Sequence, residues 1–137
     1  LPLRMGRHCE NAAKVAAFLK GHDKVENVIH PSLQSGDAAK RRDAYLKGGM
    51  GALCGFELKG GKDAGRKFID SLELLYHVAN IGDARSLAIH PASTTHSQLS
   101  AEDQASAGVT PGYVRLSIGL EHIDDILADI GQALDKV

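Results

Sequence analysis

The chain has little of several features that mark specialised classes of protein. It holds only two cysteines, Cys9 and Cys54, which are too few for a disulfide framework. No apolar run is long enough to cross a membrane, and no charged-then-apolar leader marks export. We therefore expect a protein of the reducing cytoplasm, with no membrane partner.

An excess of charge of one sign is also missing. Sixteen Lys and Arg stand against seventeen Asp and Glu, so the formal net charge is -1. The main charge cluster, Lys40 to Asp43, falls in a polar stretch that contains alanines, which is typical of a solvated helix face. No basic block of the kind that neutralises phosphates is present, and we expect no nucleic-acid partner.

Metal ligands and nucleophiles are not grouped either. His90 and His96 lie six residues apart on a polar segment, and no nearby carboxylate or thiolate completes a ligand set. Cys54 lies inside an apolar run and Cys9 on an apolar helical stripe, where a cysteine usually behaves as a small buried hydrophobe. The sequence predicts no metal site and no nucleophilic cysteine.

What is present is the pattern of one α/β domain. The 137 residues are 43% hydrophobic and 24% charged, close to the averages of globular proteins. Helical spacing of apolar residues and short β-branched runs alternate along the chain. The expected helices span residues 4–20, 36–46, 63–75, a short stretch after Ser100, and 123–137; the expected strands span 25–29, 52–58, 87–89 and 113–120. We expect helices laid against a small sheet.

Arg115 is the residue that the pattern alone singles out. It lies in the middle of an expected strand, on the face opposite Val114, Leu116 and Ile118. A guanidinium presents a planar fork that matches a carboxylate, so an arginine on a rigid strand is a good carboxylate anchor. By pattern alone, an arginine on a solvated sheet face is the more common case. The hydroxyl-rich loop over Pro91 to Gln98 is long enough to line a site.

Several segments together resemble the Cys/Met-metabolism family of pyridoxal-phosphate enzymes, which includes cystathionine synthases and lyases, methionine γ-lyase and acyl-homoserine sulfhydrylases. The resemblance runs through nearly the whole chain. The segments that carry it are Leu3 to Met5 with Arg7 to Ala12, Gly48 to Gly51, Ala79 to Ala84, His90 to His96, and Val114 to Glu121.

This resemblance implies a fold and a site. The fold would be a two-layer α/β sandwich, a small, mostly antiparallel sheet with helices on one face, like the C-terminal domain of fold-type-I pyridoxal-phosphate enzymes. Arg115 would grip the substrate α-carboxylate, with Asn80 beside it and Thr95 near the same pocket. Asn80, where many lyase relatives carry Ser, and the segment Phe56 to Gly61 are similar to the sulfhydrylase branch.

The resemblance also implies that part of the enzyme is elsewhere. Family members attach pyridoxal phosphate to a Lys in a Ser-x-Thr-Lys-like segment of a larger, preceding domain, and no Lys here has that context. The first residue is Leu1 rather than Met, and we expect that something upstream has been left out. Residues 1–137 would then be the C-terminal domain, inactive alone, of a homo-oligomeric, tetrameric parent.

Three functions fit this resemblance. The first is a sulfhydrylase that combines O-acetylhomoserine with sulfide or a thiol to give homocysteine or methionine. The second is a cystathionine synthase or methionine γ-lyase of the same family. The third is a stand-alone, non-enzymatic module that binds small carboxylates. In each of them, Arg115 would hold the carboxylate of the ligand.

Overall fold

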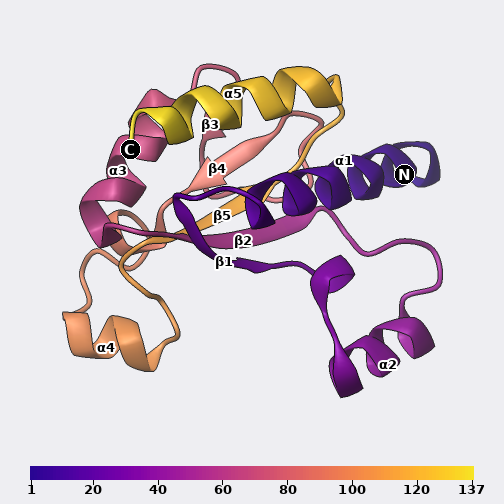
Figure 1. Ribbon diagram of the computed structural model, residues 1–137, viewed down its shortest axis with the longest axis horizontal. Helices are drawn as coiled ribbons and strands as arrows, with labels where there is room; N and C mark the ends of the chain where they lie inside the picture. The colour runs from indigo at the N-terminus through magenta and orange to yellow at the C-terminus, as the bar shows by residue number, and fades with distance from the viewer.

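A five-stranded sheet runs through the middle of the molecule (Figure 1). The computed structural model describes all of residues 1–137. The strands, β1 (Val25–Ile29), β2 (Leu53–Leu58), β3 (Tyr76–His77), β4 (Leu87–Ile89) and β5 (Tyr113–Ser117), lie in the order β1-β2-β5-β4-β3. Neighbouring strands are antiparallel except β3 and β4, which are parallel. The expectation of a small, mostly antiparallel sheet is confirmed.

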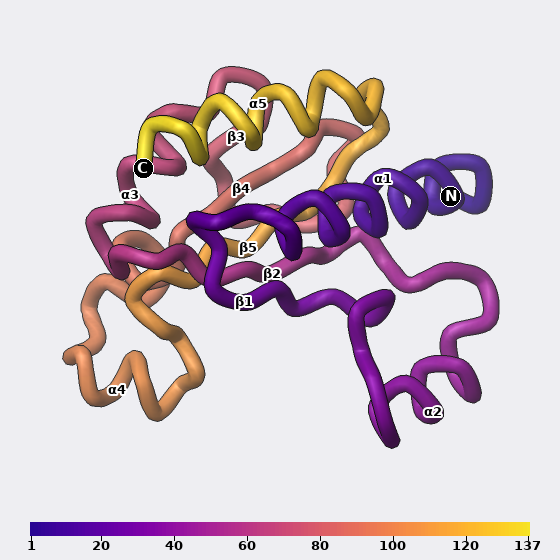
Figure 2. The backbone as a smooth tube through the Cα atoms, in the orientation of Figure 1, coloured from indigo at the N-terminus to yellow at the C-terminus, as the bar shows by residue number.

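Three helices cover one face of this sheet. They are α1 (Pro2–Lys20), α3 (Gly61–Ser71) and α5 (Ile123–Asp135), and Figure 1 shows α1 and α5 lying side by side across the strands. Two shorter helices, α2 (Gly36–Tyr45) and α4 (Ala101–Ser106), project at opposite ends on the other side (Figure 2). The predicted two-layer α/β arrangement is therefore confirmed, and the centre of the second sheet face is left without a helix.

The core lies between the sheet and the three covering helices. Strand residues alternate, so Phe56, Val114 and Leu116 point to the helices and are fully buried. Phe56 meets Phe68 of α3 edge to face, with ring centroids 5.3 Å apart. From α5, Ile126, Ile130 and Leu134 complete the core, as the apolar stripe of the final helix predicts. None of the helices is both long and apolar enough to span a membrane.

The first half of α1 differs from the prediction. The expected buried stripe began at Met5 and Cys9, but both are partly exposed, whereas His8 and Asn11 are buried. The reason is the backbone beneath, where carbonyl groups that follow β5 need hydrogen-bond donors. The expectation that Cys9 lies in a buried stripe is therefore wrong, and the buried face of α1 begins with polar side chains.

The prediction for residues 63–75 is also partly wrong, because α3 ends at Ser71. From Leu72 the backbone is extended, and it leads into β3, a strand that the sequence pattern did not indicate. Asp129 of α5 causes the break. Its carboxylate accepts hydrogen bonds from the backbone amides of Glu73, Leu74 and Leu75 at 2.9, 2.9 and 3.0 Å, so these amides do not bond within a helix.

This contact makes Asp129→Ala a strongly destabilising change. It removes a nearly buried acceptor of three backbone amides, and we expect a loss of about 2–4 kcal/mol in the free energy of unfolding. Urea unfolding of the isolated chain measures it. The control is Asp135→Ala at the exposed end of the same helix, which should change stability by less than about 0.5 kcal/mol. Equal effects of the two changes would contradict this role of Asp129.

Candidate functional site

Arg115 lies at the centre of the sheet, on the face that no helix covers. Its neighbours across the sheet are Gly55 of β2 and Ile89 of β4. Arg115 Nη2 donates a hydrogen bond to the Ala79 carbonyl at 2.7 Å, and no carboxylate forms an ion pair with the guanidinium. The predicted orientation of Arg115, opposite Val114 and Leu116, is confirmed. Its charge is positioned by the strand and is not neutralised within the chain.

Asn80 lies in a loop that is tied to β5 at two points. Arg115 holds the carbonyl of Ala79, and the Gly82 amide donates to Ser117 Oγ at 3.1 Å. Arg4 from α1 adds a third tie, because its Nη2 donates to the Gly82 carbonyl at 2.8 Å. Asn80 sits between these ties with an exposed side chain. The structure thus places it one residue from the carbonyl that Arg115 binds.

Thr95 follows the short 3-10 helix η2 (Pro91–Ser93). Its side chain is exposed, and Oγ1 lies 2.9 Å from His96 Nδ1. Thr95 and Arg115 line the same hollow, whereas Asn80 lines none of the hollows around Arg115. The structure therefore places Thr95 and Arg115 around one hollow, and Asn80 next to the carbonyl that Arg115 binds. Their roles in substrate binding stay predictions.

Two hollows of different character meet at Arg115. The first, here called the apolar groove, has a volume of about 600 Å³ and is lined by Met5, Ile29, Met50, Leu53 and Ile81 among others. The second, here called the polar hollow because its lining is the more polar of the two, has a volume of about 560 Å³; it is lined by Asn27, Glu57, Thr95, His96 and Thr110 and also by apolar residues such as Ile89 and Val109. Ile29, Tyr113 and Arg115 line both. A ligand carboxylate on Arg115 would therefore have a mainly apolar surface on one side and a mixed, more polar surface on the other.

Tyr113 is a member of the site that the sequence pattern placed on the right face without giving it a role. Its ring lies over Gly55, where an added Cβ would come within 2.4 Å of the phenol oxygen. Burial raises the pKa of Tyr113, while the charge of Arg115 acts to lower it and Cys54 to raise it. The signal in the sequence was a glycine in the middle of a strand, which often marks a close approach.

A buried polar network fixes the chain just after β5. His8 Nδ1 lies 2.6 Å from the carbonyl of Ile118, which can only accept, so the proton is on Nδ1. Asn11 Nδ2 donates to the carbonyls of Gly119 and Glu121 at 3.1 and 3.0 Å. These bonds explain why α1 buries polar residues. They join α1 to the end of the strand that carries Arg115.

The carboxylate of Glu121 closes the same network from the other side. It accepts hydrogen bonds from the Ser86 amide at 2.6 Å and from Ser86 Oγ at 2.9 Å, and the Gly119 amide donates to Ser86 Oγ at 2.8 Å. Gly119 has no room for a side chain, because an added Cβ would lie 2.4 Å from the Ala84 carbonyl. Residues 84–86 and 118–121 are thereby locked together, next to the Asn80 loop.

The other potentially reactive side chains considered in the sequence, His90 and Cys54, have structural roles. His90 is buried, with Nε2 2.7 Å from the Pro111 carbonyl and Nδ1 2.8 Å from Ser93 Oγ. Burial lowers its pKa. Cys54 is fully buried, and burial raises the pKa of its thiol to about 12, which confirms it as a small hydrophobe.

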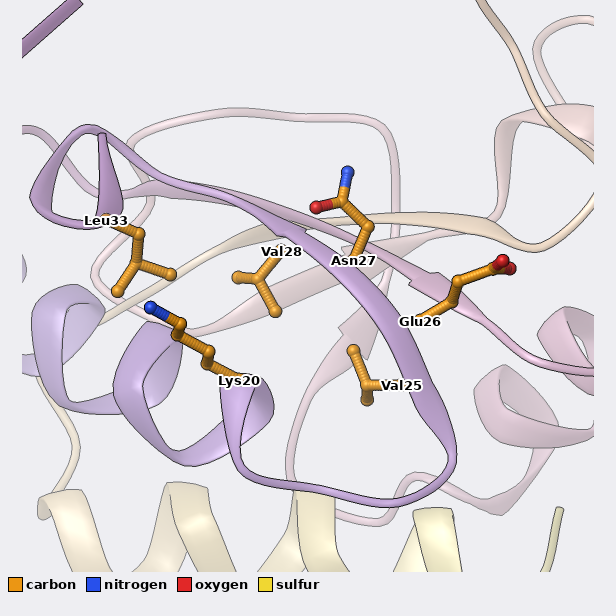
Figure 3. Close-up of a pocket in the computed structure, with 6 residues that line it drawn as sticks. All are labelled: Lys20, Val25, Glu26, Asn27, Val28 and Leu33. Carbon is orange, nitrogen blue, oxygen red and sulfur yellow. The ribbon is translucent and has the colours of Figure 1, made fainter. Parts of the chain in front are cut away.

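A further hollow lies at the outer edge of β1, between this strand and the end of α1 (Figure 3). Figure 3 shows Val25, Val28 and Leu33 along it, with Lys20 as its only cation. Val25, Val28 and Leu33 are partly buried and pack against the core. Its polar lining residues, Lys20, Glu26 and Asn27, are all exposed to solvent. Because no buried polar group marks a ligand position, this hollow is not a candidate for ligand binding.

Comparison with known proteins gives the site its chemical context. Residues 1–135 match the family described as "Cys/Met metabolism PLP-dependent enzyme", where PLP is pyridoxal phosphate. The chain belongs to this family. The sequence-based resemblance is thus confirmed.

Individual members of the family match closely. The chain is 57% identical to the O-acetyl-L-homoserine sulfhydrylase of Leptospira meyeri over 100% of its own length, and 44% identical to the L-methionine gamma-lyase of Fusobacterium nucleatum subsp. polymorphum over 98%. A crystal structure of a putative O-acetylhomoserine (thiol)-lyase from Campylobacter jejuni superposes with a TM-score of 0.88 at 42% identity over 97% of the chain. The chain spans about a third of these relatives, 31%, 34% and 32% of their lengths.

The residues around Arg115 do not provide the attachment point of the family's cofactor. Attachment needs a lysine amine, and no lysine lines the apolar groove or the polar hollow. The Campylobacter jejuni structure contains an N'-pyridoxyl-lysine-5'-monophosphate, and the lysine that bears it lies outside the part matched by this chain. These 137 residues therefore contribute a cation, Arg115, at the border of two hollows.

The packing of Tyr113 on Gly55 is testable by titration. Gly55→Ala places a Cβ where the ring lies, so the ring should be displaced toward solvent and the raised pKa of Tyr113 should fall. Ultraviolet absorbance of the phenolate, with Tyr113→Phe to assign the transition, measures it. An unchanged Tyr113 titration in Gly55→Ala would contradict the contact.

Proposed function

We propose that residues 1–137 form the C-terminal domain of an O-acetylhomoserine sulfhydrylase and bind the α-carboxylate of its substrate through Arg115. The observation that carries the proposal is an arginine on a rigid central strand, without an ion-pair partner, at the border of two hollows. The 57% identity to a named sulfhydrylase supports the choice of substrate. The parent would combine O-acetylhomoserine with sulfide or a thiol, as a homo-oligomeric, tetrameric enzyme.

The geometry suits a carboxylate. One N–H of Arg115 is used by the Ala79 carbonyl, which fixes the plane of the guanidinium and leaves its other N–H groups for a ligand. Two parallel hydrogen bonds to a carboxylate are stronger than neutral ones and also set the direction of the ligand. The amide of Asn80 can donate to the same carboxylate, and Thr95 can contact it from the polar hollow. This chain would thus bind and orient the substrate.

The covalent chemistry would take place on the part of the parent that carries the cofactor lysine. When bound, pyridoxal phosphate supplies the electron sink that this reaction class needs. The 137 residues offer no lysine beside Arg115, so we propose that they are inactive alone. In the assembled enzyme, Arg115 would hold the carboxylate still, so that the reacting carbon keeps one position.

A methionine γ-lyase is the second candidate, because one such relative is 44% identical over 98% of the chain. Both activities need a carboxylate anchor, so Arg115 does not separate them. The two activities can be separated by assaying the full-length parent with O-acetylhomoserine plus sulfide and, in parallel, with methionine alone. Turnover of methionine without turnover of O-acetylhomoserine would favour the lyase.

Arg115→Ala in the full-length parent tests the anchor. We expect the apparent KM for O-acetylhomoserine to rise by about 30- to 150-fold, which corresponds to about 2–3 kcal/mol of lost charge-assisted bonding. Arg115→Lys should lose a large part of this binding, because an ammonium lacks the planar fork. Arg85→Ala is the control: its guanidinium lies 5.1 Å from the Tyr76 ring centre and lines neither hollow. An unchanged KM in Arg115→Ala would overturn the assignment.

A further inference from the structure

A separate hollow, here called the cationic hollow, is lined by residues from α3, from β3 and from the end of η2. Its volume is about 360 Å³, and its polar lining residues are Lys62, Arg66, Asp70, His77, Ser93 and Thr94. None of them lines the apolar groove or the polar hollow. The cationic hollow is therefore distinct from the candidate substrate site.

Three basic side chains from two elements converge on the cationic hollow. Lys62 and Arg66 lie four residues apart and so on one face of α3, and His77 comes from β3. Asp70, the one acidic lining residue, lies a further four residues along α3, and neither it nor Lys62 nor Arg66 forms an ion pair. Like charges four residues apart on a helix repel each other, so a bound anion would relieve this repulsion.

The buried ring of His90 lies close to the same basic groups. Burial is the main cause that lowers its pKa, and the hydrogen bond with Pro111 acts to raise it. The charges of Lys62, Arg66 and His77 each lower it further. Three positive charges thus act together on one buried ring. The positive field of the cationic hollow reaches the loop that follows β4.

Close packing of α3 on His90 holds the two walls of the hollow in place. A Cβ added at Gly65 of α3 would overlap the His90 ring, so the helix approaches this ring directly. His90 Nε2 faces the carbonyl of Pro111, which can only accept, so the proton is on Nε2 and the neutral ring accepts at Nδ1 from Ser93 Oγ at 2.8 Å. Thr94 Oγ1 donates to the His90 carbonyl at 2.9 Å. Both hydroxyl protons are used within the fold, and the side-chain donors left for a ligand are the three basic ones.

We infer that the cationic hollow is a binding site for a small, doubly charged oxyanion, a phosphate or sulfate group. Such an anion accepts hydrogen bonds on every side, which matches a hollow whose available side-chain donors are all basic. Two negative charges would balance those of Lys62 and Arg66. The inference goes beyond the proposed function, because Arg115 is not part of this site.

The cationic hollow adjoins two segments of the candidate substrate site. Thr94 lines the cationic hollow, and Thr95, the next residue, lines the polar hollow. His77 lies two residues before Ala79, whose carbonyl accepts the hydrogen bond from Arg115. An anion held between α3 and these segments would restrain both of them.

Titration calorimetry of the full-length parent with inorganic phosphate tests the site. The parent is saturated with pyridoxal phosphate, so that its cofactor site is filled, and carries Arg115→Ala, which removes the other candidate anion site. At about pH 8 and constant ionic strength, we expect one phosphate per chain, and sulfate with a Kd within about threefold of it. Acetate, with a single charge, should bind at least about tenfold more weakly. Absence of phosphate binding, or equal binding of acetate, would overturn the inference.

Variants of α3 in the same parent locate the bound anion. Lys62→Ala and Arg66→Ala should each raise the Kd for phosphate at least about tenfold, because each removes a charge-assisted donor. Arg66→Lys keeps the charge and should raise the Kd less. The control is Lys67→Ala, an equally exposed position of the same helix that does not line the hollow, and it should leave the Kd unchanged. The same Kd in Arg66→Ala and Lys67→Ala would contradict the inference.

The anion could be a free ion or the phosphate group of a small ester, and glycerol 2-phosphate distinguishes the two sources. A Kd close to that of inorganic phosphate would assign the hollow to the phosphate group in either form. A Kd at least about tenfold higher would assign it to the free ion.

Hydrogen exchange gives an independent readout of the same site. Bound phosphate should slow the amides of residues 93–94 at least about threefold, because the loop is then restrained, and should leave residues 104–107 of α4 and its end unchanged. If phosphate binds to the parent with Arg115 intact but not to Arg115→Ala, the anion occupies the substrate anchor and the inference is wrong. That outcome would leave the proposed function intact.

Discussion

The hydrogen-bond network around residues 118–121 is the constraint on which the site depends. Three carbonyl groups that follow β5 turn toward α1, two of them buried and one partly buried, and each needs a donor. His8 and Asn11 supply the donors from α1, and Glu121 binds Ser86 from the other direction. Removing one partner from such a network leaves buried polar groups unpaired, which costs more than the bond itself contributes.

This network fixes the end of β5, and β5 in turn positions the side chains of Arg115 and Tyr113 and the Asn80 loop on the open face of the sheet. Arg115 is held by its strand pairs with Gly55 and Ile89, and it holds the Asn80 loop through Ala79. Tyr113 fits over Gly55 because that position has no side chain. The result is a cation without an ion-pair partner, between a mainly apolar surface and a more polar one. We propose that a carboxylate bound there would be oriented by the fold.

The sequence predicts most of the framework and one residue of the site with its orientation. Strong periodicity identified α5, and alternation placed Arg115 opposite the core, because both patterns follow from burial on one face. The end of α3 was not predictable, because Asp129, distant in sequence, determines it. The prediction of the buried face at the start of α1 was wrong for the same reason. His8 and Asn11 are buried because they form hydrogen bonds with carbonyl groups that are distant in sequence and that only the fold brings near. Tyr113 on Gly55 likewise depends on strand register.

We propose that the parent enzyme consists of a part that orients the substrate and a part that reacts with it. The direct test is reduction with borohydride in the presence of pyridoxal phosphate, followed by mapping of the modified lysine. We expect the full-length parent to carry one stoichiometric adduct, on a lysine outside these 137 residues. The isolated chain should carry none. A stoichiometric adduct on one lysine of the isolated chain would contradict the division and the central claim with it.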